Sequence, residues 1–218
     1  MLRGFEKPSE PCSKSIFSQE GEELILQELL GGARHGCYVD IGAYDPWKFS
    51  NTASFYKKGW SGLNVDARPG FKTLFDKHRP KDLNIECLVG AKKKSIKFYL
   101  FDEPALNTIC RDRVDHLEKS TTYRLKEIIL VPSRSLEDLL QTFGEHTIDF
   151  MSIDVEGAEL NVLQSGNWKK YRPKYLVLEI LDTSYSQLSK NPCIRFMKKN
   201  GYEVLTKGLR SVILRNIQ

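Results

Sequence analysis

The sequence lacks any long hydrophobic run. No segment approaches the roughly 18 consecutive apolar residues of a membrane span, and residues 1–15 contain no apolar core of signal-peptide length. With 40% hydrophobic and 28% charged residues, the composition is that of a soluble globular protein and not of a disordered one. These properties predict a cytoplasmic protein without a transmembrane segment, and they leave open a peripheral contact with a membrane.

Paired cysteines are also missing. The 218-residue chain has five cysteines and no CxxC pair, which excludes the usual zinc-ribbon and thioredoxin-like patterns. Cys37 and Cys87 lie in apolar, strand-like runs, as expected of reduced thiols that act as small hydrophobic side chains. The four histidines show no metal-ligand spacing. One of them, His116, lies in an irregular middle segment and is a candidate base.

Glycine-rich phosphate loops are absent as well. The sequence contains neither GxGxxG nor GxxxxGK[ST], and the apolar run at residues 37–43 carries Gly42 alone. Because a glycine-lined helix N-terminus is what binds a pyrophosphate, this absence disfavours a nicotinamide oxidoreductase. A nucleoside cofactor without phosphates, such as S-adenosylmethionine, fits better.

No concentrated basic stripe is present. Lys and Arg number 33 against 28 Asp and Glu, a net charge of +5, and no Lys/Arg stripe is interleaved with aromatic residues. We therefore expect no nucleic-acid partner. The modest excess either favours anionic partners weakly or reflects a solvated surface rich in lysine. The oligomeric state is not readable from the sequence.

What the sequence does contain is an alternation of strand-like and helical runs. Strand-like runs occupy residues 37–43, 60–67, 84–91, 94–101, 128–133, 147–155, 175–180, 202–208 and 210–216, and helical runs occupy residues 18–32, 71–79, 135–144, 157–166 and 193–201. Such alternation implies βαβ units and a mostly parallel sheet with helices on both faces, closed by an antiparallel C-terminal hairpin. Polar residues 1–16 are interpreted as an N-terminal arm, and residues 17–218 as a single α/β domain.

Acidic residues stand at the ends of several strand-like runs, namely Asp40, Asp66, Asp154, Glu156 and Glu179. In an open parallel sheet, ligands bind at the carboxyl ends of the strands. Asp66 follows Asp40 by about one βαβ unit, which is the position of a carboxylate that accepts hydrogen bonds from ribose hydroxyls. The alternatives are that Asp40 organises its own loop and that Asp66 caps the following helix.

The stretch FMSIDVEGAEL concentrates three of these charges. Asp154 and Glu156 are two positions apart, so in an extended backbone both point into one pocket, and Glu179 on the next strand can converge with them. The three carboxylates can act as a general base, bind the acceptor, or hold Mg²⁺, which prefers oxygen ligands. Glu156 can instead start the next helix, where an acid interacts favourably with the dipole. Glu159 is expected to be a surface or first-turn charge.

Four segments resemble one known family. YVDIGAYDPWKFSNT, FYKKGWSGLNVDARPG, EPALNT and DFMSIDVEGAEL are together similar to the FkbM-type family of S-adenosylmethionine-dependent methyltransferases, and they occur in the same order. The resemblance spans residues 17–215. It implies the seven-stranded Rossmann-like class I methyltransferase fold and O-methylation of a hydroxyl on a small-molecule or glycan acceptor, often a sugar or a polyketide. A catalytically inactive binding domain of the same fold is the alternative from another class.

The resemblance also assigns candidate site residues. It places cofactor binding on Asp40, Gly42, Ala43, Ser50, Asn51, Thr52, Asp66, Ala67, Val89 and Gly90, and catalysis on Asp154 and Glu156. Glu179 joins the catalytic candidates through its position at the end of the next strand. If a metal is used, the same three acids would be its ligands. The cofactor loop departs from the general methyltransferase pattern, because DPW at residues 45–47 replaces the later glycines.

Overall fold

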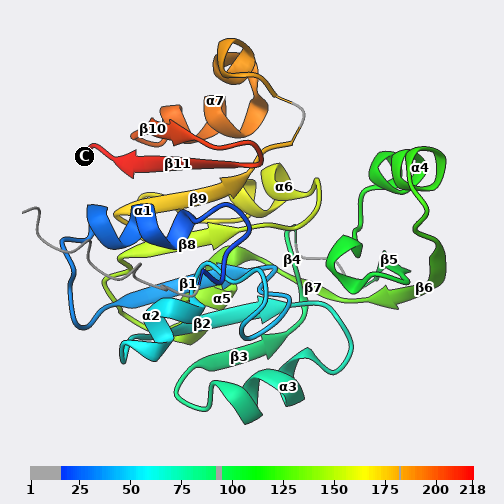
Figure 1. Cartoon of the computed structure of the whole chain (residues 1–218), viewed down its shortest axis with the longest axis horizontal. Helices are drawn as coiled ribbons and strands as arrows, with labels where there is room; N and C mark the ends of the chain where they lie inside the picture. The colour runs from blue at the N-terminus through cyan, green and yellow to red at the C-terminus, as the bar shows by residue number, and fades with distance from the viewer. Residues whose placement is uncertain (1–15, 92–94, 182) are drawn as a thin grey trace, which may run out of the picture.

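The computed structural model describes residues 16–91, 95–181 and 183–218. Its centre is a seven-stranded sheet in the order β10-β11-β9-β8-β1-β2-β3 (Figure 1). The strands are β1 (Cys37–Ile41), β2 (Ser61–Asp66), β3 (Leu83–Glu86), β8 (Phe150–Ile153), β9 (Tyr175–Glu179), β10 (Tyr202–Lys207) and β11 (Ser211–Asn216). In this sheet β11 is antiparallel to both of its neighbours, and the other pairings are parallel. The predicted parallel sheet with an antiparallel C-terminal hairpin is therefore confirmed.

Helices cover both faces of this sheet. They are α1 (Glu22–Leu29), α2 (Ala53–Lys57), α3 (Phe71–His78), α5 (Leu136–Phe143), α6 (Glu159–Gln164) and α7 (Pro192–Lys199). One core cluster joins β1, β8 and β9 to α5, α6 and α7, whereas a second cluster joins the opposite face of the same strands to α1 and α2. The sequence did not predict α2, or the short 3-10 helix η2 (Tyr185–Lys190).

Side-chain alternation along β1 decides what each residue faces. Val39 and Ile41 are fully buried among the helices of the first cluster, and Tyr38 is fully buried in the second. Because alternate side chains of a strand point to opposite faces, Asp40 shares the face of Tyr38. The acid therefore points under the loop that precedes α2.

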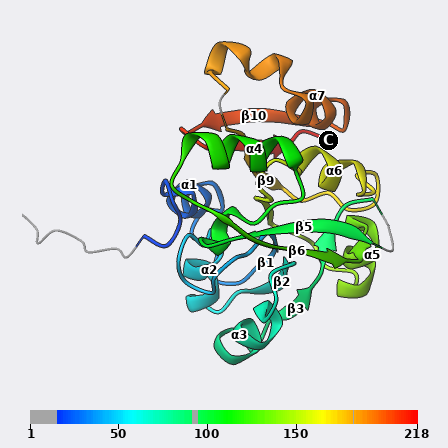
Figure 2. The ribbon, with the colours of Figure 1, turned by 90° about the vertical axis from the view of Figure 1, so that its right-hand side faces the viewer.

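A smaller unit interrupts the alternation of strands and helices. β5 (Ile96–Phe101) and β6 (Leu125–Val131) form an antiparallel pair, with η1 (Pro104–Leu106) and α4 (Arg111–Ser120) between them. The predicted strands at residues 94–101 and 128–133 thus exist outside the main sheet. Figures 1 and 2 show this unit beyond the carboxyl ends of the parallel strands. The predicted strand at residues 84–91 is divided into β3 and β4 (Leu88–Val89), and β4 pairs with β7 (Ser133–Arg134).

The segment before α1 is fastened to the C-terminal hairpin. The carboxylate of Glu20 accepts hydrogen bonds from the backbone amides of Arg210 at 3.0 Å and Ser211 at 3.2 Å. The N-cap of this helix is Gly21 and not Ser18. Ser18 instead accepts the Gly21 amide and donates its hydroxyl to Glu23. Across the described ranges, no helix is both long and apolar enough to span a bilayer.

Candidate functional site

A cavity opens at the carboxyl ends of β1, β2 and β8, below the β5–β6 unit. Its walls include Gly42, Asp66, Val89, Asp154 and Glu156, which were all candidates from the sequence. Parallel strands bring their carboxyl ends to one edge of the sheet, so residues separated by more than 100 positions meet there. The topology of the chain thus gathers these candidates in one hollow.

Three residues with unusual backbone geometry line this main cavity. Tyr44, Phe49 and Glu156 have φ angles of 50°, 57° and 53°, and they are the non-glycine residues of the described ranges with positive φ. All three lie in the cavity wall. Residues other than glycine occupy this left-handed region at an energetic cost, and such residues concentrate at functional sites. The unusual backbone conformations and the acidic residues therefore both indicate the main cavity as the functional site.

Asp66 is held by the loop across from it. Its two carboxylate oxygens accept hydrogen bonds from the backbone amides of Tyr44 at 2.9 Å and Arg68 at 2.7 Å. Burial raises the pKa of Asp66, and these amide donors oppose the rise. A carboxylate offers about four lone-pair sites, so Asp66 can still accept a hydrogen bond from a ligand. Asp66 does not cap α3, because the N-cap of that helix is Gly70.

Gly42 makes the closest approach between two strand ends. It has a φ of 82°, and an added Cβ would lie 1.6 Å from the carbonyl oxygen of Asp154. Its amide donates to the carbonyl of Val65 at 2.8 Å. Only glycine satisfies both the conformation and the contact, and the β1 and β8 loops can therefore form one continuous wall.

Asp40 belongs to a buried network beneath the loop. It is 5% exposed and accepts a hydrogen bond from the Thr52 hydroxyl at 2.9 Å. The fully buried Arg79 donates to Thr52 at 2.7 Å, to Ser50 at 2.8 Å and to the carbonyl of Pro46. Burial raises the pKa of Asp40 to about 6, although Arg79 and Thr52 lower it. The structure thus places Asp40, Ser50 and Thr52 behind the cavity wall.

The remaining cofactor candidates divide in the same way. Ala67 lines the main cavity, whereas Ala43 packs against Phe71 and Phe75 of α3. Asn51 donates to the Ser152 hydroxyl at 3.0 Å and lines a small polar niche beside the main cavity. Gly90 lies one residue beyond the wall formed by Val89 and continues to β7 through a hydrogen bond to the Arg134 carbonyl.

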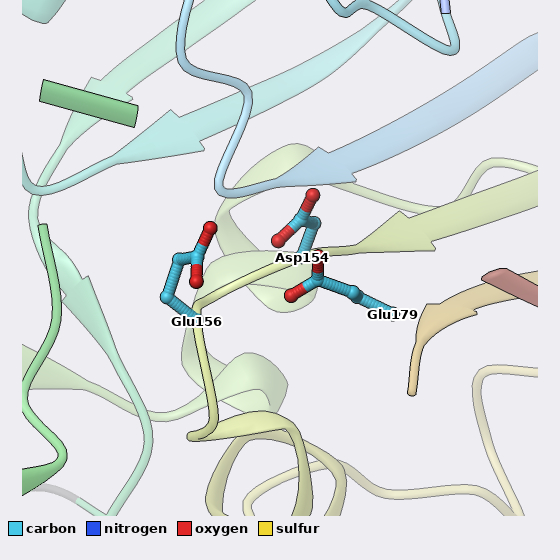
Figure 3. Close-up of side chains that lie close together, drawn as sticks. All are labelled: Asp154, Glu156 and Glu179. Atoms are coloured by element: carbon cyan, nitrogen blue, oxygen red, sulfur yellow. The ribbon is translucent and has the colours of Figure 1, made fainter. Parts of the chain in front are cut away.

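The three acids predicted to act together do converge. Asp154, Glu156 and Glu179 each present a carboxylate oxygen within 4.8 Å of the others, and Figure 3 shows the three groups turned toward one space. Asp154 and Glu179 are hydrogen bonded to each other. Burial, followed by repulsion from Glu156 and Glu159, raises the pKa of Glu179 to about 8. Burial and the Glu179 charge raise the pKa of Asp154 well above its ordinary value.

Glu156 has a partner that the other two acids lack. Arg113 of α4 donates Nε at 3.1 Å and Nη2 at 2.8 Å to one oxygen of Glu156. The hydroxyl of Thr108 donates to the Glu156 carbonyl at 2.8 Å. Burial raises the pKa of Glu156, and the charge of Arg113 opposes this. The interpretation of Glu156 as the start of a helix is wrong, because α6 has its N-cap at Ala158.

Glu159 organises the turn between β8 and α6. It is 8% exposed, and its carboxylate accepts the amides of Val155 at 3.2 Å and Gly157 at 3.0 Å. Burial raises its pKa, and these amides lower it. Glu159 does stand in the first turn of α6, but it is not a surface charge. Its hydrogen bonds fix the loop that carries Glu156.

Sequence reasoning did not find several residues of the site. Gln19, Phe98 and Asn107 line the main cavity, and Arg113 holds Glu156. The segment EPALNT did point to the neighbourhood of Asn107 and Thr108, since it was one of the four resembling segments. Arg113 carried no such signal, because it belongs to no motif and its role depends on the folded position of α4.

The fold and the site define a class of protein. The strand order with one reversed strand, together with a cavity at the carboxyl ends bounded by Asp66, Asp154 and Glu156, is that of a Rossmann-like methyltransferase. The model of the family described as Methyltransferase FkbM domain matches residues 40–204. The chain belongs to this family, as its sequence motifs indicated, and it is a methyltransferase.

Comparisons with individual proteins add little beyond this. A search of curated protein sequences finds no match. A TehB-like SAM-dependent methyltransferase from Corynebacterium glutamicum ATCC 13032 is similar in structure, with 10% identity, a TM-score of 0.49, and coverage of 94% of this chain and 90% of the other. A precorrin-6y C5,15-methyltransferase from Geobacter metallireducens GS-15 gives 11% identity, a TM-score of 0.47 and coverages of 94% and 93%. Neither similarity bears on the acceptor of this chain.

Proposed function

We propose that the protein transfers a methyl group from S-adenosylmethionine to a hydroxyl of a sugar or glycoconjugate. One observation carries the proposal: a single cavity is lined both by a carboxylate suited to ribose hydroxyls, Asp66, and by two members of the acid cluster, Asp154 and Glu156. The first feature suits a nucleoside, and the second suits proton removal from a hydroxyl. Both are needed for methylation of oxygen.

The residues present fit this methyl donor. Asp66 retains free lone pairs after binding two amides, and Leu88, Val89 and Phe98 supply apolar surface in the same wall. These side chains would bind the ribose and the adenine, respectively. S-adenosylmethionine supplies a methyl group on a positively charged sulfur, which is open to attack by an oxygen nucleophile. The absence of a glycine-rich phosphate loop agrees with a cofactor that has no phosphates.

The Asp154–Glu179 pair is the proposed base. A sugar hydroxyl is a weak acid, so its proton must be accepted as the oxygen attacks. A carboxylate whose pKa is raised toward neutrality is a stronger base than an ordinary one, and the pKa of Glu179 is raised to about 8. Glu156 is already bonded to Arg113, so its expected role is to hold the acceptor. Alignment of the acceptor oxygen supplies much of the remaining rate.

A Mg²⁺ site is a second candidate role for the acids. The three oxygens within 4.8 Å favour it, since Mg²⁺ is bound by one or two carboxylates and keeps several waters. The cation would lower the pKa of the acceptor hydroxyl. Calorimetric titration of the protein with Mg²⁺ alone tests this role without any acceptor. Heat of Mg²⁺ binding that is seen in wild type and disappears in Asp154→Asn supports the metal site. If wild type shows no such heat, the general-base role of the acids is retained.

Calorimetry also tests the proposed donor. We expect S-adenosylmethionine and S-adenosylhomocysteine to bind and NAD not to bind. Asp66→Ala should weaken binding at least about tenfold, because a hydrogen bond to a charged acceptor contributes about 1.5–3 kcal/mol. Asp76→Ala is the matched control, since Asp76 lies on the surface of α3. NAD binding in place of the methionine cofactor would overturn the proposal.

A further inference from the structure

A second cleft lies on the far side of the acid cluster. Cys110, Arg113 and His116 form one side of it, and Glu179, Asn191 and Cys193 lie on the other. It therefore runs between α4 and the segment that follows β9. Its volume is about 290 Å³, close to the lower limit of roughly 300 Å³ for small-molecule pockets. We call it the side cleft.

The side cleft meets the other cavities at the acids. Glu179 lines both the side cleft and the polar niche, and Asp154 lines the niche and the main cavity. The ion pair of Arg113 with Glu156 stands between the main cavity, where Glu156 faces, and the side cleft, where Arg113 faces. A molecule in the side cleft thus reaches the proposed base without entering the main cavity.

The charges of the side cleft limit what it can bind. Arg113 is its single Lys or Arg among the described residues, and that guanidinium is already bonded to Glu156. Two nearby cations are engaged or face elsewhere. Lys207 donates to the carbonyls of Ile180 and Leu209, and Arg210 lines the polar niche. Carboxylates are provided by Glu159 and Glu179. An anionic ligand would meet acids and no free guanidinium or ammonium group.

We propose that the side cleft is the acceptor site and that it takes an uncharged or amine-bearing polyol in preference to an anionic one. The assignment rests on the proposed methyl transfer and adds the acceptor's entrance and charge class to it. Hydroxyl and amine hydrogens of such a ligand can bond to Glu179, His116 and Asn191. The overall charge of +5, which favoured anionic partners weakly, therefore does not describe this site.

Cys110 provides a reporter inside the side cleft. It is a free, half-buried thiol, whereas Cys193 on the opposite side of the cleft is buried and burial raises its pKa to about 12. We would measure modification of Cys110 by peptide mass spectrometry at about pH 8.5, above the pKa of about 8 of Glu179, so that this acid is mostly ionised. The reagents are cationic aminoethyl methanethiosulfonate and anionic sulfonatoethyl methanethiosulfonate. Each rate is divided by the rate for N-acetylcysteine. The cationic reagent should be favoured at least about tenfold, the lower range of electrostatic focusing in clefts.

A variant shows whether the acid produces this preference. Glu179→Gln should move the ratio of the two rates toward that of N-acetylcysteine, and Glu203→Gln on the surface of β10 should not. Equal or faster modification by the anionic reagent in wild type overturns the charge assignment, whether or not the variants fold. Release of S-adenosylhomocysteine should be stimulated more by methyl glucoside or glucosamine than by glucuronate, and the reverse order also overturns it.

The two proposals fail in different ways. If S-adenosylmethionine does not bind the unmodified protein, the proposed function fails whatever the charge ratio. If it binds, protein carrying the aminoethyl group on Cys110 should bind it with unchanged affinity, because Cys110 does not line the main cavity. Lost affinity in that calorimetric experiment would show that the two cavities are one site and would overturn the side cleft as a separate entrance.

Discussion

Arg113 donates two N–H groups to a single carboxylate oxygen of Glu156, 43 residues further along the chain. The side chains are only 16% and 10% exposed. This ion pair fastens α4, and with it the β5–β6 unit, to the loop that carries the acids. It also holds a residue whose backbone is in the left-handed region. The β5–β6 unit, which covers the main cavity, is thus bonded directly to one of the acidic residues that line this cavity.

Replacing Arg113 should destabilise the protein. Arg113→Met leaves the Glu156 carboxylate buried without its partner, which costs about 3 kcal/mol when an ion pair is sheltered from water. Urea unfolding measures the change. The double variant with Glu156→Gln should recover part of the loss, because no unpaired charge then remains.

A control for Arg113 lies on the same helix. Arg111 pairs with Asp115, but both side chains are well exposed, so Arg111→Met should leave the urea midpoint unchanged. Equal effects of Arg111→Met and Arg113→Met would show that any charge change on α4 matters, and the specific tie to Glu156 would be rejected.

Gly42→Ala should be among the most damaging single substitutions. The added Cβ would lie 1.6 Å from a backbone oxygen, and φ is 82°, so both strand ends must move. We expect a loss above about 3 kcal/mol, in the range of severe overpacking. Gly59→Ala is the control, because φ is 97° there but no atom lies within 4 Å of the new Cβ. Its loss should be about 1–2 kcal/mol, and similar losses in both variants would contradict the contact argument.

Stability should fall as pH rises toward 8. Burial, Glu156 and Glu159 raise the pKa of Glu179 from 4.5 to about 8, so the folded state holds its proton more tightly than the unfolded state. The resulting stability is fully present below about pH 4.5 and is lost as pH rises through about 8. Its steepest slope is about 1.4 kcal/mol per pH unit for one proton. Urea unfolding between about pH 6 and pH 9, with EDTA present, measures it.

Glu179→Gln tests the source of this slope. The variant cannot titrate at this position, so the decline above about pH 6 should become shallower. The contribution of Asp40, whose pKa is raised to about 6, lies at lower pH and should persist. Glu203→Gln should keep the wild-type curve, since its side chain is 42% exposed. A decline as steep in Glu179→Gln as in wild type would assign the proton to another group.

Phe49→Gly should separate stability from ligand binding. Phe49 has a φ of 57°, is 44% exposed and stacks on Tyr44 with ring centroids 6.3 Å apart. Glycine relieves about 1 kcal/mol of backbone strain, which offsets a stacking loss of about 0.5–1.5 kcal/mol. We expect little change in unfolding but weaker binding of S-adenosylmethionine in calorimetry. Phe49→Leu, which keeps the strain, should be less stable than Phe49→Gly, and unchanged affinity in both would remove Phe49 from the site.

The sheet was predictable because its signals are local. Runs such as YLVLEI around β9 carry their own burial pattern, and parallel strands between helices allow few arrangements. The incorrect predictions concern segments whose pairing partners are distant in the sequence. β5 and β6 have the pattern of strands, but nothing in residues 96–101 indicates that they pair with each other outside the main sheet.

The sequence predicted where the acidic residues lie in the sheet, but it did not predict which side chains they contact. Asp154 and Glu179 could be placed at one edge because parallel strands end together. That Asp40 faces away from the main cavity follows from the alternation of side chains along β1. The fully buried Arg79, which is linked to Asp40 through the Thr52 hydroxyl, lies 39 residues later and belongs to no motif. Arg113 was missed for the same reason. Charges acquire partners through tertiary packing, and a single sequence carries no record of that pairing.

The hydrogen bonds that Glu20 accepts from the amides of Arg210 and Ser211 have a consequence for the order in which the site forms during synthesis. Gln19, next to Glu20, lines both the main cavity and the polar niche, yet the hairpin that fastens this segment is made 190 residues later. A nascent chain on the ribosome can assemble β1, β2 and β3 long before that hairpin emerges. The wall containing Gln19 is completed last, so the protein should acquire ligand affinity only after translation has passed β11.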